Sequence, residues 1–181
     1  TLRGTPFLYY GDELGMLEAE ISPEERRDPW GKAVSYLSRD GARSPMQWTP
    51  GPGAGFSREG SADPWLPIGG EYQTRNVERE LEDRGSLLNL YRRLLSLRAR
   101  SSALRVGSFL THPASTAEVF AYRRESDDET MTVALNFGRE ETTIALGACT
   151  VVFSTADPER SDRANQALRL APLEGVVVSH V

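Results

Sequence analysis

The chain has 181 residues, of which 39% are hydrophobic and 26% are charged, and its formal net charge is −5. This composition excludes a disordered or collagen-like chain and predicts one or two folded domains. No apolar run approaches the roughly 18 residues needed to cross a bilayer, so we expect no membrane partner. Acidic and basic residues are interspersed without a basic stripe, which argues against a nucleic-acid partner.

Cys149 is the only cysteine, so no disulfide can form within the chain. It lies in the apolar run 149–153, which predicts a small core residue rather than a nucleophile. No segment resembles a signal peptide, so a cytoplasmic location is the default expectation. The sequence begins at Thr1 rather than at methionine, and we therefore expect a fragment or a processed product.

The N-terminal part combines an apolar run with a long irregular segment. Residues 5–10 are almost continuously apolar and precede Gly11, which predicts a buried parallel strand that enters a loop. Residues 21–84 are rich in glycine and proline and contain all three tryptophans, Trp30, Trp48 and Trp65. Such a loop is either pinned by aromatic anchors or lines a ligand site, and the anchoring interpretation is the simpler one.

Residues 86–100 give the clearest helix signal. Ser86 follows a glycine and suits the N-cap position. Apolar residues recur at steps of three and four, which predicts one buried face: Leu87, Leu90, Tyr91, Leu94 and Leu97. The arginines of this segment are interpreted as solvated: Arg92, Arg93, Arg98 and Arg100.

Beyond residue 103 the hydrophobic period changes to two, which indicates strands. Turn signals separate six candidate strands: 118–123, 131–137, 142–146, 149–153, 167–170 and 175–179. Short strands at this spacing predict an antiparallel β-sandwich. Phe120 and Tyr122 share one strand face, and we interpret them as core residues.

The sequence offers few candidates for catalysis. His112 and His180 have no Cys, His or carboxylate cluster at ligand spacing, so we expect no metal and no cofactor. Asp12 and Glu13 follow the first apolar run, but neighbouring side chains of an extended chain point to opposite sides. They make a poor pair for glycoside cleavage, and a loop-anchoring role is favoured for each.

The segment from Arg39 through Asp40 to Arg43 is the other polar cluster, and Trp48 and Phe56 follow it closely. An arginine can hold a carboxylate bidentately or donate to sugar hydroxyls, and aromatic rings can stack on a sugar. From these residues alone, a surface ion pair explains the cluster equally well.

Four segments carry a resemblance to a known family. Residues 4–16, with Tyr-Tyr-Gly-Asp-Glu, resemble the last barrel strand and following loop of glycoside hydrolase family 13, the α-amylase superfamily. Residues 38–48, with Arg-Asp-Gly-Ala-Arg and Pro-Met-Gln-Trp, resemble its α-glucosidase and oligo-1,6-glucosidase branch. Residues 86–98 are similar to the last barrel helix, and 133–137 to a strand of the C-terminal domain.

The resemblance implies an α/β fragment, the last β/α unit of a (β/α)8 barrel, in residues 1–101. An all-β antiparallel sandwich domain would then occupy residues 102–181. Family members are retaining enzymes with three catalytic carboxylates on earlier barrel strands, so no catalytic residue is assigned in this chain. We expect the remainder of the barrel as a partner, and this chain alone to be inactive.

The resemblance also assigns substrate-binding residues. It implies that Arg43 binds glucose in the −1 subsite, and that Asp40 and Arg39 orient the loop of that site. The implied substrate is an oligosaccharide or another terminal α-linked glucoside.

Two other interpretations stay open. A trehalose synthase or sucrose isomerase of the same superfamily carries a similar Arg-Asp to Met-Gln-Trp run, although residues 23–29 favour an α-glucosidase. A non-catalytic carbohydrate-binding or structural β-sandwich module is the other alternative.

Overall fold

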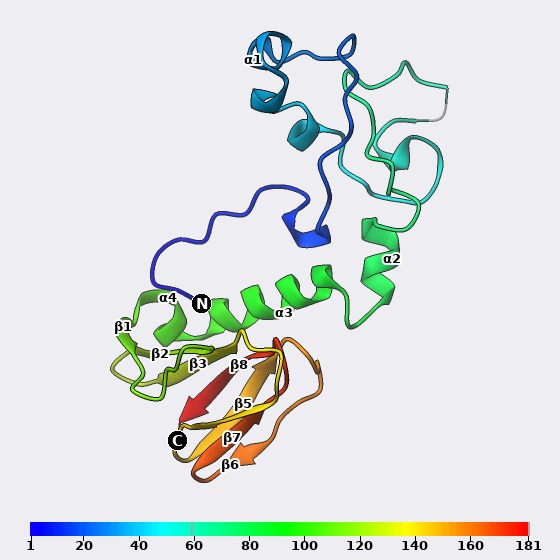
Figure 1. Cartoon of the computed structure of the whole chain (residues 1–181). Helices are drawn as coiled ribbons and strands as arrows, with labels where there is room; N and C mark the ends of the chain where they lie inside the picture. Colours follow the sequence, from blue (N-terminus) through cyan, green and yellow to red (C-terminus); the bar gives the residue numbers. More distant parts are fainter. Residues whose placement is uncertain (59, 181) are drawn as a thin grey trace. The chain divides into compact units, whose positions relative to one another are not determined.

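The computed structural model describes residues 1–58 and 60–180 (Figure 1). It divides into two compact units. The first, here called the sheet unit, combines Thr1–Pro6 with the chain from Leu90 onward, and the second, here called the loop unit, is Phe7–Asn89. Among the described residues, no helix is both long and apolar enough to cross a membrane.

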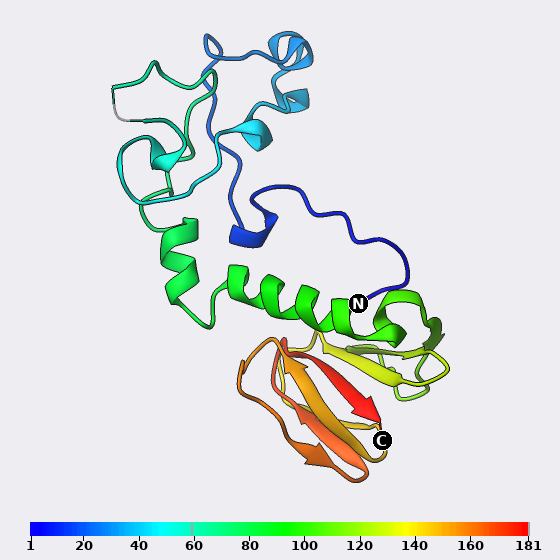
Figure 2. The same ribbon diagram turned by 180° about the vertical axis from the view of Figure 1, so that it is seen from behind.

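The sheet unit contains a six-stranded antiparallel sheet in the order β1-β2-β3-β8-β5-β6 and a two-stranded sheet of β4 and β7. In both views β5 and β8 run side by side (Figures 1 and 2). The strands are β1 (Ser108–Thr111), β2 (Val119–Glu125), β3 (Thr130–Asn136), β4 (Thr142–Ala145), β5 (Cys149–Ser154), β6 (Arg163–Ala164), β7 (Ala167–Leu170) and β8 (Gly175–His180).

The six strands expected from the period-two pattern are all present within one or two residues of their predicted ends. Strands β1 and β6 were not predicted, because β1 has no buried residue in alternation and β6 has only two residues. The prediction of antiparallel pairing is confirmed.

A hydrophobic cluster joins the two sheets of the sheet unit. Ile144 of β4 and Leu168 of β7 share it with Val119, Val151 and Val178 of the larger sheet. Cys149 belongs to this cluster, so its prediction as a buried core residue is confirmed. Burial raises the pKa of the Cys149 thiol, which keeps it protonated and unreactive at neutral pH.

Helices cover the other face of the larger sheet. Helix α3 (Leu87–Arg100) packs the side chains of Leu90, Leu94 and Leu97 against a cluster that includes Tyr122 and Phe153, and α4 (Ser102–Val106) adds Ala103 and Leu104 to it. The predicted N-cap is confirmed, because Ser86 Oγ accepts a hydrogen bond from Asn89 N at 3.2 Å.

Most of α3 therefore belongs to the same unit as the strands, since its apolar face is buried against the sheet. The compact units do not coincide with the predicted division into residues 1–101 and 102–181. The expectation that the helix arginines are solvated is wrong for Arg93, whose guanidinium lies 5.0 Å from the centre of the Phe153 ring. It is also wrong for Arg98, whose guanidinium donates to backbone carbonyl oxygens, among them that of Leu104.

Arginine side chains hold the first residues of the chain within the sheet unit. Arg124 is fully buried on β2 and donates to the carbonyl oxygens of Thr1, Gly107 and Ser108. Arg98 donates to the carbonyl oxygens of Leu2 and Gly4. Backbone carbonyls thus take the place of a counter-carboxylate for a buried cation.

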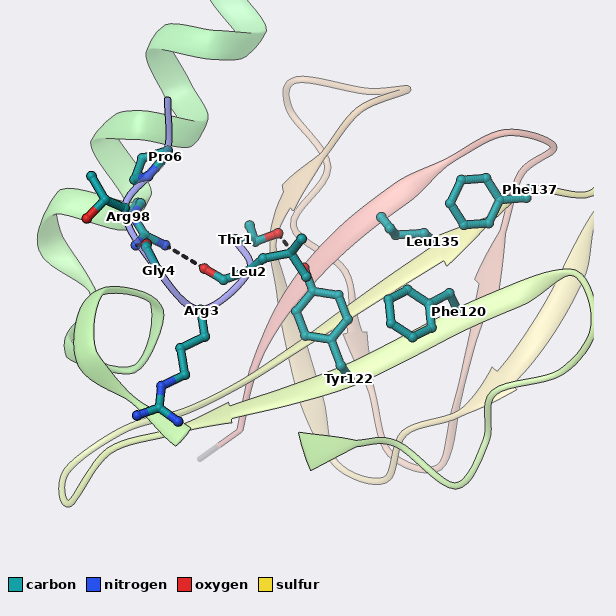
Figure 3. A pocket seen from close by; sticks show the side chains of 11 residues that line it. Thr1, Leu2, Arg3, Gly4, Pro6, Arg98, Phe120, Tyr122, Leu135 and Phe137 are labelled. Carbon is teal, nitrogen blue, oxygen red and sulfur yellow. Dashed lines mark hydrogen bonds between the residues drawn. The ribbon is translucent and has the colours of Figure 1, made fainter. Parts of the chain in front are cut away.

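These first residues border an apolar hollow, shown in Figure 3 with Phe120, Leu135 and Phe137 close together on the sheet. Tyr122 is buried, stacks on Phe109 at 4.9 Å between ring centres, and hydrogen bonds to Thr1. The core interpretation is therefore confirmed for Tyr122, whereas the ring of Phe120 stays partly exposed.

Residues 5–10 do not form the predicted buried strand. They have no strand assignment, and their side chains are exposed. A parallel strand needs neighbouring strands to accept its backbone hydrogen bonds, and none of the described residues pairs with this segment.

The loop unit is mostly irregular, as predicted. Its helices are short: α1 (Pro29–Ala33), α2 (Val77–Glu82), and the 3-10 turns η1 (Asp12–Leu14), η2 (Ser35–Leu37), η3 (Gly41–Arg43) and η4 (Pro52–Gly55). Buried Leu14, Met46 and Leu66 supply apolar contacts. Asn76 caps α2 by accepting from Arg79 N at 3.0 Å.

A buried ion pair fixes the long connection between β5 and β7. Glu174 accepts hydrogen bonds from Arg160 at 2.7 Å, Ser154 at 2.6 Å and Ala171 N at 2.8 Å. Burial opposes ionisation of this carboxyl, but these donors outweigh it and hold the pKa of Glu174 below its ordinary value.

We expect Glu174→Gln to lower the free energy of unfolding by about 2 kcal/mol at neutral pH, because a charge-assisted network is lost. Since folding lowers the pKa of Glu174, its contribution is lost as the pH falls through the folded-state pKa, and the difference from wild type should shrink there. Urea unfolding followed by circular dichroism measures both effects.

The matched control is Glu141→Gln, because Glu141 pairs with Arg169 on the surface. Its removal should cost less than about 1 kcal/mol. Equal losses in the two variants would contradict a special contribution of the buried network.

Candidate functional site

A hollow of about 430 Å³ in the loop unit brings together residues from separate parts of the sequence. We call it the Arg43 hollow. Its walls combine one cation and one carboxylate with aromatic and apolar side chains, a composition typical of sites for small organic ligands. The lining residues are Tyr10, Glu13, Arg43, Ser44, Pro45, Met46, Trp48, Phe56, Pro64 and Trp65.

The loop that carries Arg43 is held by a buried carboxylate, Asp28. Its two oxygens accept from Arg39 Nε at 2.7 Å and Arg39 Nη2 at 2.8 Å, and also from Arg39 N and Trp30 N. These hydrogen bonds, led by those of the Arg39 side chain, hold the pKa of Asp28 well below its usual range. The pair is a bidentate clamp across an eleven-residue separation.

Asp40 is a second buried carboxylate in the same loop. It accepts from Arg27 N at 2.8 Å and from Asp28 N at 2.9 Å, with a weaker contact to Ser38 Oγ. Burial opposes its ionisation, but the backbone donors prevail and the pKa of Asp40 lies below its ordinary value. Its own carbonyl accepts from Arg43 N at 2.9 Å, which closes the turn η3.

The three predicted substrate-binding residues therefore separate into two groups. Arg43 lines the hollow, and no hydrogen bond or ion pair within residues 1–58 and 60–180 occupies its guanidinium. Arg39 and Asp40 do not line the hollow, because their side chains are engaged in holding the loop. Their contacts are consistent with the predicted role of Arg39 and Asp40 in orienting the loop.

Tyr10 forms a wall of the hollow that sequence reasoning missed. Its hydroxyl donates to the carbonyl oxygen of Ser44 at 2.9 Å, and burial raises its pKa above the ordinary value. Asp12 and Glu13 beside it accept hydrogen bonds from the backbone N–H groups of Tyr9 and Gly11. These contacts agree with the favoured loop-anchoring role, and Glu13 also lines the hollow.

Trp48 and Phe56 reach the hollow through a tight turn. The backbone N–H of Trp48 donates to the carbonyl oxygen of Ala54 at 2.8 Å. Gly55 has a φ of +67°, and a Cβ there would lie 3.2 Å from Cβ of Trp48, so glycine is required. Both rings are about half exposed, which leaves their faces available to a ligand.

The arrangement suits recognition rather than bond cleavage. The Arg43 guanidinium offers donors, and the rings of Trp48 and Trp65 offer apolar faces. The nearby aspartates Asp28 and Asp40 are buried under N–H donors and cannot approach a ligand. The sequence predicts Trp65 only as a loop residue, because the convergence of loops leaves no periodic pattern.

The family of this chain follows from a comparison with known protein families. A family model described as "Alpha amylase, catalytic domain" matches residues 1–107. The chain belongs to the α-amylase family. The resemblance of residues 4–16 and 38–48 to glycoside hydrolase family 13 is thereby confirmed.

Relatives within this family differ in activity. The α-glucosidase of Apis mellifera is 35% identical over 153 residues, which are 81% of this chain and 26% of the relative. The trehalose synthase/amylase TreS of Mycolicibacterium smegmatis is 39% identical over 129 residues, which are 69% of this chain and 19% of the relative. The chain thus spans about a quarter of the length of the curated relatives it matches.

The fold of this family member also matches solved structures. The trehalulose synthase MutB of Pseudomonas mesoacidophila is similar with a TM-score of 0.79 and 30% identity, over 98% of this chain and 36% of that one. Structures of variants of the same synthase hold glucose, isomaltulose or sucrose.

We expect Asp28→Asn to loosen the loop that carries Arg43, because the bidentate pair with Arg39 is lost. Trypsin should then cleave after Arg39 and Arg43 several-fold faster, since cleavage requires local opening. The rates can be measured by mass spectrometry of timed digests. Glu24→Gln, an exposed acid nearby, is the control, and equal rates in both variants would contradict the clamp.

Proposed function

We propose that this chain is the C-terminal part of a retaining α-glucosidase that acts on terminal α-linked glucosides. In this proposal residues 1–101 complete the catalytic (β/α)8 barrel, and residues 102–181 form its C-terminal β-sandwich domain. The Arg43 hollow supplies one wall of the −1 subsite, which holds the glucose ring whose bond is cut.

The observation that carries the proposal is the convergence of Arg43 with aromatic rings in one hollow. A guanidinium such as that of Arg43, with no hydrogen bond or ion pair among the described residues, can donate to several sugar hydroxyls at once. Aromatic faces such as that of Trp48 suit the apolar C–H face of a pyranose ring. Together these groups can bind a hydroxyl-rich ring, and Glu13 in the same lining carries a carboxylate that can accept from a sugar hydroxyl.

The catalytic carboxylates have to come from elsewhere. Retaining cleavage needs two carboxyl groups about 5 Å apart that converge on one bond. Asp28 and Asp40 are buried in loop hydrogen bonds, and Asp12 and Glu13 accept from the local backbone. We therefore propose that the remainder of the barrel provides the nucleophile and the acid/base, and that these 181 residues alone are inactive.

Substitution of Arg43 tests the binding role. Arg43→Ala should weaken binding of methyl α-glucoside to this chain about tenfold, because hydrogen bonds from a charged donor are lost. Titration followed by the NMR shift of the Trp48 indole N–H measures the affinity. The control is Arg58→Ala, an exposed arginine that does not line the hollow. Unchanged affinity in Arg43→Ala would contradict the proposal.

A second candidate is part of a trehalose synthase or sucrose isomerase. The identity with TreS and the structural similarity to MutB support it. Both reactions begin with the same glucosyl transfer, so the Arg43 hollow is compatible with either outcome. The two differ in whether water or a sugar hydroxyl accepts the glucosyl group.

Product analysis separates these candidates. We expect the longer enzyme that contains this chain to release glucose from maltose. Accumulation of trehalose from maltose, or of an isomer from sucrose, would instead assign the chain to a synthase or isomerase. Chromatography of the products over time gives the answer.

A further inference from the structure

Residues 112–118 join β1 to β2, and local hydrogen bonds hold this connection against β2. β1 lies at the edge of the larger sheet and pairs with β2 (Figure 1). The backbone N–H of His112 donates to the carbonyl oxygen of Ala121 at 2.9 Å. Ser115 Oγ donates to the same oxygen at 2.9 Å and accepts from Ala121 N at 3.0 Å. We call residues 112–118 the His112 connection.

The imidazole of His112 is a hydrogen-bond acceptor inside this connection. His112 is only 7% exposed, and its Nδ1 accepts from the backbone N–H of Ala114 at 3.2 Å. A ring nitrogen accepts a hydrogen bond only when it carries no proton, so the neutral ring carries its proton on Nε2. The hydrogen bond from Ala114 therefore exists only while His112 is neutral.

The surroundings of His112 oppose a positive charge on its ring. Burial, the Arg123 guanidinium on β2 and the His180 ring on β8 lower the pKa of His112 below its ordinary value, and burial contributes most. The nearby carboxylate of Glu125 on β2 is paired with Arg123 at 3.2 Å. Glu118, in the connection itself, is exposed to solvent. A protonated His112 would thus face a guanidinium in a poorly hydrated place.

His180 differs from His112, because its hydrogen bonds are compatible with protonation. Its Nδ1 lies 3.2 Å from the carbonyl oxygen of Ala148, and its Nε2 lies 2.7 Å from Oγ1 of Thr132. A carbonyl oxygen only accepts, so Nδ1 carries a proton in either charge state. The Thr132 hydroxyl can donate to a neutral Nε2 or accept from a protonated one. Of the two histidines in the chain, His112 is the one that must lose a hydrogen bond when it is protonated.

We propose that protonation of His112 in mildly acidic solution releases the His112 connection from β2. The imidazolium has an N–H on both nitrogens, so Nδ1 then opposes the Ala114 N–H that it binds when neutral. Because the ring is less basic in the closed connection than in the open one, closure weakens as the pH falls below about 6.5, the ordinary pKa of histidine. The connection lies in the sheet unit, and its opening does not depend on the proposed function.

Hydrogen exchange of backbone amides in the 181-residue chain, followed by NMR at about pH 7.5 and about pH 5.5, tests the proposal. We expect the protection factor of the Ala114 amide, which corrects for the intrinsic pH dependence of exchange, to fall about fivefold on acidification. Low concentrations of urea should leave exchange of Ala114 unchanged, because a local opening exposes little surface. They should accelerate exchange of Val133 in the buried strand β3, which requires global unfolding.

Three variants locate the effect on the His112 ring. His112→Asn keeps a side-chain acceptor for the N–H two residues on but does not titrate, so the protection of Ala114 should not fall on acidification. His112→Ala removes the acceptor and should give low protection at both pH values. His180→Gln is the matched control, because it removes the other imidazole, and it should retain the fall seen in wild type.

A fall of equal size in His112→Asn and in wild type would overturn the proposal. Urea dependence of Ala114 exchange equal to that of Val133 would also overturn it, because the opening would then be global. The nitrogen chemical shifts of the two imidazoles test the wild-type chain without any substitution. We expect neutral His112 to carry its proton on Nε2. A proton on Nδ1 at neutral pH would contradict the acceptor role of His112 and overturn the proposal.

Discussion

Two buried carboxylates, Asp28 and Asp40, determine the shape of the loop unit. This segment has no strands among its described residues and only short helices, so its backbone cannot satisfy itself by regular pairing. Asp28 instead binds Arg39 at both oxygens, and Asp40 binds the backbone N–H groups of Arg27 and Asp28. The carboxylates replace the hydrogen bonds that a sheet or a long helix would supply.

The position of Arg43 follows from that constraint. The carbonyl of Asp40 accepts from Arg43 N and closes a 3-10 turn, while the side chain of Arg43 remains unpaired among the described residues. Tyr10 then ties the following residue, Ser44, to the start of the loop unit. Charged side chains in the loop thus differ in their contacts: Asp28, Arg39 and Asp40 hold the backbone, and Arg43 lines the hollow.

The strands and the main helix could be predicted because their burial is periodic. The alternation in residues 131–137 and the three-to-four spacing of Leu90, Leu94 and Leu97 reflect side chains that pack on one face. The burial of Arg124 could not be predicted from this pattern. An arginine in a strand is expected to face solvent unless the carbonyl groups that accept its hydrogen bonds are known. Residues 5–10 do not form the expected strand, because no strand among the described residues pairs with them.

The candidate site was only partly predictable. Arg43 came from a resemblance in a specific motif, and Trp48 and Phe56 from their nearness in sequence. The contributions of Tyr10 and Trp65, 33 residues before and 22 residues after Arg43, could not be found this way. Loops converge through particular hydrogen bonds, such as that of Tyr10 with Ser44, which leave no periodic signal.

Hydrolysis of p-nitrophenyl α-glucoside by the purified 181-residue chain tests the central claim most directly. We predict no turnover, because Asp28 and Asp40 are bound within the loop and the catalytic carboxylates are proposed to lie in the remainder of the barrel. Turnover that Arg43→Ala abolishes would show that this chain holds its own catalytic carboxylate pair. That result would contradict the division between a binding wall in this chain and catalytic groups supplied from elsewhere.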